Sequence, residues 1–125
     1  MAITYVVDDF SGVVFVHSLG IITAKDIADH WALLLADKEA VVCGKILVDV
    51  RESEVQLTES ELWHLIITIL EPAMQGRRWK MAILVREAVQ YYMSRQLQVF
   101  TAGYCENAIF ADDSIALEWI EQGGL

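Results

Sequence analysis

The histidines of this sequence are the first residues to weigh for chemistry, because histidine binds metals and transfers protons near neutral pH. There are three, at His17, His30 and His64. Glu61 and His64 have the Glu-x-x-His spacing of di-iron helices, but such a site needs two of these pairs and two further glutamates. The sequence offers one pair. We therefore expect structural roles for the histidines, with no metal and no other cofactor.

Motifs of covalent catalysis are missing from the sequence. It contains no Gly-x-Ser-x-Gly, no Ser/Lys signature, no glycine-rich phosphate loop and no cysteine with a histidine nearby in sequence. Cys43 and Cys105 stand far apart without a Cys-x-x-Cys pair, which predicts two free thiols. We therefore predict that the protein is not an enzyme.

Polar side chains accompany the ends of two apolar runs, residues 46–50 and 81–85. They are Asp49, Arg51, Ser53 and Arg86. Ligands of open α/β sheets bind beyond the carboxyl ends of the strands, so these residues form a candidate rim for an anion or another ligand. The alternative is that both arginines pair with neighbouring carboxylates.

An alternation of strands and helices positions these residues. Residues 3–18 have the pattern of an antiparallel hairpin, because two strand-like segments flank a turn cluster at residues 9–12. A helix is predicted over residues 24–38, where apolar residues recur at helical spacing. Thr23 and Asp26 at its start have a weak capping-box pattern.

The rest of the chain continues this alternation. Residues 41–44 are expected to lead into the strand at 45–50, and the continuous apolar runs there and at 81–85 predict strands buried on both faces. Thr58 and Glu61 form a full capping box at the start of a helix that is expected to end near Pro72. The pattern then predicts a helix after the second buried strand, a strand at residues 107–110, and a last helix that begins at Asp112.

The predicted order is β-β-α-β-α-β-α-β-α. Crossovers of this kind give a largely parallel sheet, and the opening hairpin adds an antiparallel edge. We therefore predict an α/β fold with a mixed five-stranded sheet and four helices. The length of 125 residues suits one domain, which we expect to span residues 1–125.

The composition is acidic and rich in apolar residues. Nine basic against 18 acidic residues give a net charge of −9, which argues against binding to nucleic acid or to anionic membranes. No apolar run reaches the roughly 18 residues of a membrane span, and the first residues lack a signal-peptide pattern. We therefore expect a cytoplasmic protein.

Hydrophobic residues make up 55% of the chain, above the roughly 45–50% of typical soluble domains. This surplus predicts that part of the surface is covered. The side chains expected to be left over once the core is filled are Trp63, Ile67, Leu70, Tyr91 and Tyr92. A dimer interface, a pocket for an apolar ligand and a two-sided core remain as explanations.

Three local patterns, in this order of elements, resemble the STAS-type, SpoIIAA-like domains of bacteria. They are residues 20–26 before the first helix, residues 46–51 as the central strand, and residues 109–113 with 116–120 at the end. The resemblance covers nearly the whole chain. It implies a homodimeric or partner-binding regulatory module without catalytic activity. A carrier or sensor of a small apolar or amphiphilic ligand is the alternative.

The regulatory members of that family are anti-sigma-factor antagonists, which are switched by phosphorylation of a serine at the start of the helix after the central strand. Thr58 begins the corresponding helix here. The family pattern is Asp-Ser followed by a small residue, whereas this chain has Glu59 and Glu61 beside Thr58. Both carboxylates would repel a phosphate. The resemblance is therefore to divergent, stand-alone members, and Thr58 is interpreted as a helix cap, with phosphorylation as the alternative.

Overall fold

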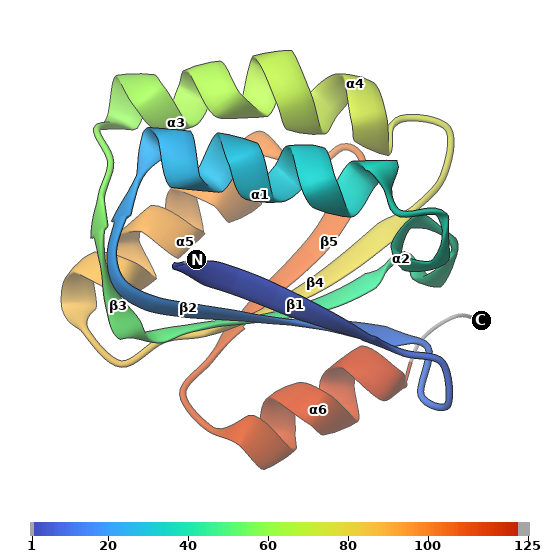
Figure 1. The fold of residues 1–125 in the computed structure, drawn as a ribbon. Coiled ribbons are helices and arrows are strands. Elements are labelled where there is room, and N and C mark those ends of the chain that lie inside the picture. Colours follow the sequence, from blue (N-terminus) through green and yellow to red (C-terminus); the bar gives the residue numbers. More distant parts are fainter. Residues whose placement is uncertain (1, 123–125) are drawn as a thin grey trace.

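A five-stranded sheet in the order β1-β2-β3-β4-β5 divides the molecule into two unequal layers, and the computed structural model describes residues 2–122 (Figure 1). The strands are β1 (Ile3–Asp8), β2 (Val13–Thr23), β3 (Lys45–Gln56), β4 (Trp79–Leu84) and β5 (Cys105–Phe110). β1 and β2 are antiparallel, while β2, β3, β4 and β5 run parallel to one another. The predicted mixed sheet is confirmed.

Most helices lie on one face of this sheet. They are α1 (Ala24–Ala36), α3 (Glu59–Leu65), the π-helical turn η1 (Ile66–Leu70), α4 (Glu71–Met74) and α5 (Ala88–Phe100). α6 (Asp113–Glu121) covers the opposite face alone (Figure 1). Within residues 2–122, no helix is both long and apolar enough to cross a membrane.

Two hydrophobic clusters match these two layers. The larger cluster joins the sheet to α1, α3, η1 and α4, and includes Val14, Ile46 and Ile66. The smaller cluster includes Leu47 on the sheet and Ile120 on α6. Consecutive residues of β3 thus enter different clusters, which confirms that this apolar run is buried on both faces.

The helix predicted over residues 24–38 ends two residues earlier. Its capping box is present, since the Thr23 hydroxyl accepts from the amide of Asp26 and the Asp26 carboxylate accepts from the amide of Thr23. Asp37 then caps another helix, α2 (Lys38–Cys43), by accepting hydrogen bonds from the amides of Glu39 and Ala40.

Residues 41–44 lead into β3 at Lys45 as expected, but the sequence pattern did not predict that residues 41–43 end a helix. α2 ends at Gly44, which adopts the left-handed conformation with φ 65°. The Arg77 guanidinium donates hydrogen bonds to the carbonyls of Val41 and Val42. A left-handed glycine and a cation at the last carbonyls together stabilise the end of this short helix.

The helix that begins after Thr58 ends near Pro72 as predicted, at Met74, so it continues through the proline for two residues. Pro72 has no amide hydrogen, and within an α-helix its ring would clash with the carbonyl of residue 68. The π turn η1, over Ile66–Leu70, ends two residues before Pro72. A wider turn at this point accommodates the proline without ending the helix.

β2 and β3 continue as a two-stranded ribbon beyond the rest of the sheet. Their register shifts from His17–Asp49 to Leu19–Glu52, so β3 carries one extra residue, a β-bulge. Residues 19–23 and 52–56 then curve toward α1 and α3 (Figure 1). The prediction that the central strand ends at residues 49–53 is therefore wrong. It continues to Gln56 because it keeps β2 as a partner after β4 has ended.

Candidate functional site

An apolar cavity of about 140 Å³ lies between the larger helical layer and the sheet. Its walls come from α1, α3, η1, α5 and the curved ribbon, with Ile22 and Val55 on the ribbon and Leu62, Ile66 and Met93 on the helices. None of the described residues that line it is Asp, Glu, Lys or Arg. The lining therefore suits an uncharged, largely apolar molecule.

Two polar side chains in the lining are fully engaged with the protein. The Gln90 amide donates to the carbonyls of Val50 and Ser53, at 2.8 and 2.9 Å, and its oxygen accepts from the backbone amides that precede α5. The Ser94 hydroxyl donates to the Gln90 carbonyl at 2.8 Å. Both residues are buried. Gln90 thereby ties α5 to β3, and its side-chain amide has no hydrogen-bonding capacity left for the cavity.

Two other polar side chains in the lining have no such partners. His30 on α1 is 5% exposed and Ser18 on β2 is 4% exposed. Within residues 2–122, no hydrogen bond engages the His30 ring or the Ser18 hydroxyl. The fully enclosed side-chain atoms that have no partner in the described residues are others, Trp79 Nε1, Gln96 Oε1, Tyr104 OH and Asn107 Oδ1, so the polar atoms of His30 and Ser18 keep some accessible surface. Both contribute hydrogen-bonding atoms to an otherwise apolar cavity.

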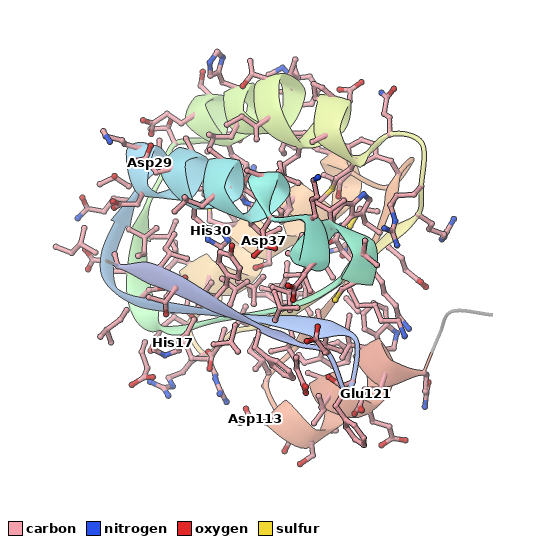
Figure 2. All side chains as sticks on the ribbon, turned by 45° about the vertical axis from the view of Figure 1, so that its right-hand side comes forward. His17, Asp29, His30, Asp37, Asp113 and Glu121 are labelled. Atoms are coloured by element: carbon pink, nitrogen blue, oxygen red, sulfur yellow. The ribbon has the colours of Figure 1, made fainter. Side chains whose placement is uncertain are left out.

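The surroundings of His30 keep its ring neutral. The ring lies beneath α1, between the helix and the sheet (Figure 2). It makes edge contacts with Tyr5 and Trp31, at centroid distances of 6.1 and 5.6 Å. The Tyr5 hydroxyl is bonded to Asp37 at 2.8 Å. Burial lowers the pKa of His30 from 6.5 to about 4, because the charged imidazolium would lose its hydration.

Two residues of the predicted rim, Asp49 and Arg51, form ion pairs on the other side of the sheet. Arg51 makes a two-point contact with Asp49, at 3.0 Å from Nε to Oδ1 and 2.8 Å from Nη2 to Oδ2, and its Nη1 pairs with Asp113 of α6. Burial alone would raise the pKa of Asp49, but the hydrogen bonds and charge of Arg51 bring it below the usual value. The Arg51 guanidinium is thus shared between two carboxylates.

The bulge in β3 separates Ser53 from Asp49 and Arg51. Ser53 is buried, its hydroxyl donates to the Val50 carbonyl at 2.8 Å, and its own carbonyl accepts from Gln90 on α5. Arg86 is exposed, and its backbone amide donates to the same Gln90 side chain. The extra residue reverses the alternation of the strand, which the sequence pattern did not reveal.

Thr58 is the N-cap of α3. Its hydroxyl accepts from the Glu61 amide at 3.1 Å, and the Glu61 carboxylate accepts from the Thr58 amide at 2.9 Å. The predicted capping box is confirmed. His64, the partner of Glu61 in the Glu-x-x-His pattern, is exposed. Within residues 2–122, no group of three or more potential metal ligands comes together.

The predicted left-over apolar residues divide into two sets. Leu70 is 4% exposed and lines the cavity, as part of the core. The others remain on the surface, at 47% exposed for Trp63, 40% for Ile67, 52% for Tyr91 and 59% for Tyr92. Trp63 packs edge to face against Phe100 of α5, at a centroid distance of 4.9 Å.

Comparison with solved structures identifies the fold. An uncharacterized protein of the DUF3478 family with a SpoIIAA-like fold, from Shewanella loihica PV-4, matches with a TM-score of 0.65 at 20% identity over 95% of this chain and 94% of that one. This chain has the SpoIIAA-like fold. An anti-sigma factor antagonist from Mycobacterium paratuberculosis matches with a TM-score of 0.62 at 19% identity, over 96% and 95% of the two chains. No protein-family model and no curated protein matches the sequence significantly.

Within this SpoIIAA-like fold, the sequence contained a signal for the cavity that its interpretation missed. His30 occupies the apolar stripe of α1, between Ile27, Trp31 and Leu34. A polar residue in the buried stripe of an amphipathic helix marks either a satisfied core group or a site. Ser18 gives a similar signal, because it falls at an inward position of β2, two residues after Val16.

Proposed function

We propose that this protein is a non-catalytic regulatory module whose cavity binds a small apolar ligand. The observation that carries the proposal is the 140 Å³ cavity with an apolar lining and two unpartnered polar groups. A cavity of about 150 Å³ is large enough to bind benzene. The likeness in fold to an anti-sigma factor antagonist supports a regulatory role over a catalytic one.

The ligand-binding proposal is tested by thermal unfolding in the presence of small apolar molecules of six to eight non-hydrogen atoms. A ligand that binds only the folded state at ten times its Kd adds about 1.4 kcal/mol, and we expect a rise in Tm of roughly 5 °C. Met93→Trp should abolish this rise, because Met93 on α5 lines the cavity and the larger side chain fills it.

Val99→Trp is the matched control. Val99 lies on the same helix but is 61% exposed and lies outside the cavity lining. The wild type and Val99→Trp should respond equally to each ligand. The proposal would be contradicted if the ligands raised the Tm of Met93→Trp as much as that of the wild type. It would also be contradicted if none of the molecules raised the Tm of the wild type.

A second function, binding of a protein partner or of a second copy of this chain, is favoured by a different observation. Trp63 and Phe100 join α3 and α5 at the surface, and Trp63 keeps 47% of its area exposed. Ile67 on η1 and Tyr91 and Tyr92 on α5 are also exposed. Aromatic residues of this kind concentrate at protein interfaces.

A further inference from the structure

The two unpartnered polar groups of the cavity constrain the chemistry of its occupant. The inference drawn from them rests on the proposed function, since it requires that the cavity bind a ligand. Gln90 and Ser94 show that polar side chains in this lining can be paired within the protein. His30 and Ser18 are equally buried but have no hydrogen bond within the described residues. Their hydrogen-bonding capacity is available to a bound molecule.

The charge of that molecule is restricted by the absence of charged neighbours. The described lining holds no Asp, Glu, Lys or Arg, and the hydroxyl of Tyr5, whose ring contacts His30, donates to Asp37 at 2.8 Å. The buried ring of His30 is neutral at pH 7 because burial lowers its pKa to about 4. A carboxylate or an ammonium group would lose its hydration without gaining an opposite charge. The occupant is therefore uncharged.

The polar group of the molecule follows from the neutral imidazole. A neutral histidine presents one N–H donor and one nitrogen acceptor, and a serine hydroxyl also donates and accepts. A hydroxyl group on the ligand matches either partner, whichever tautomer His30 adopts. A ketone or an ether accepts only, and a hydrocarbon leaves both protein groups unpaired.

The size of the molecule follows from the cavity volume. About 140 Å³ accommodates a molecule close to benzene in size, and the flat rings of His30 and Trp31 border the space. We propose that the cavity binds a small, uncharged molecule with one hydroxyl group, of the size of phenol, and that His30 holds the hydroxyl. An ordered water molecule on His30 is the rival occupant.

Phenol and toluene provide a direct test, because each has seven non-hydrogen atoms and they differ by a hydroxyl in place of a methyl group. We expect wild-type protein to bind phenol at least tenfold more tightly than toluene by calorimetric titration, although toluene is the more hydrophobic of the two. His30→Phe should reduce phenol affinity at least tenfold and leave toluene affinity within threefold. Ser18→Ala should weaken phenol binding without affecting toluene.

His64→Phe is the matched control, since His64 is exposed on α3 and lies outside the cavity lining. It should retain the wild-type preference for phenol. A second measurement needs no variant: phenol should shift the ring-nitrogen resonances of His30 in wild-type protein, and toluene should leave them in place. This readout covers the case in which His30→Phe fails to fold.

Each outcome is decisive. Binding of toluene as tight as that of phenol, or a preference for phenol that persists in His30→Phe, would overturn the assignment of a hydroxylated ligand and leave the ligand-binding function standing. Binding of neither molecule to the wild type would overturn both. Binding of benzoate in preference to phenol would show that the occupant is charged and would overturn the assignment as well.

Discussion

Buried titratable side chains make the stability of a folded core depend on pH. His30 is the clearest case in this protein. A buried imidazole resists protonation because the charged form loses its hydration. Its ring contacts the aromatic rings of Tyr5 and Trp31, at centroid distances of 6.1 and 5.6 Å. The same burial that makes His30 suitable for binding an uncharged ligand also makes the folded state sensitive to acid.

The first prediction concerns this sensitivity. The pKa of His30 is about 4 in the folded chain and 6.5 when exposed, so the unfolded state binds more protons between these values. Stability is therefore fully present above pH 6.5 and falls as the pH drops toward 4. From pH 7 to pH 5.5 the loss from this residue should be about 1 kcal/mol. Urea unfolding at the two pH values measures it.

His30→Phe provides the comparison, because phenylalanine keeps a ring at this position and cannot be protonated. Its loss of stability between pH 7 and pH 5.5 should be smaller than that of the wild type by about 1 kcal/mol. The Tyr5 hydrogen bond lowers the pKa of Asp37, so that carboxylate affects stability only at still lower pH. An identical pH dependence in both proteins would show that His30 is already solvated.

The stability of a short helix depends strongly on the residues that cap its ends. α2 is the example in this fold. It has six residues, begins at the Asp37 cap and ends at Gly44. A side chain at Gly44 would meet two obstacles. The φ of 65° disfavours any residue with a Cβ, and that Cβ would lie 2.5 Å from Nη2 of Arg77.

The second prediction follows from these two obstacles. Gly44→Ala should lower the free energy of unfolding by about 2 kcal/mol, of which about 1 kcal/mol is backbone strain and the rest the displacement of Arg77 from its carbonyls. Gly12→Ala is the matched control, because Gly12 has φ 72° but nothing within 4 Å of its Cβ position. It should cost only the strain, about 1 kcal/mol.

A double-mutant cycle separates the two contributions. In the Arg77→Ala background the guanidinium is gone, so Gly44→Ala should cost no more than Gly12→Ala. Chemical denaturation of the four proteins gives the coupling energy between residues 44 and 77. A cost of Gly44→Ala that is the same with and without Arg77 would mean that Arg77 does not restrain this glycine.

The elements also show what the sequence could and could not predict. Capping boxes at Thr23 and Thr58 and the buried runs of β3 and β4 are local patterns, and they were predicted correctly. The bulge in β3 and the π turn before Pro72 were not, because pairing with β2 and packing against the core decide them. The cavity lies against the ribbon that the bulge introduces, so the site was hidden for the same reason.

At the scale of the whole molecule, the apolar surplus of the composition is divided between the cavity and the surface. The SpoIIAA-like fold places α6 alone on one face and the other long helices on the opposite face (Figure 1). Trp63 and Ile67 lie on the outside of the larger helical layer and keep 47% and 40% of their area exposed. A single chain therefore leaves the outward side of α3 and η1 exposed.

The last prediction tests whether a second copy covers this surface. A stable dimer buries about 1,200–2,000 Å² in total, and exposed aromatic residues on α3 and α5 provide typical anchors. We expect a wild-type dimer by light scattering over a tenfold range of concentration, and a monomer for Ile67→Asp, because a buried unpaired carboxylate is costly. Ile115→Asp is the matched control, since Ile115 is 57% exposed on α6, in the opposite layer. It should remain a dimer. A monomeric wild type, or a dimer that neither substitution breaks, would show that this surface does not associate with itself, and a different protein would then be sought as its partner.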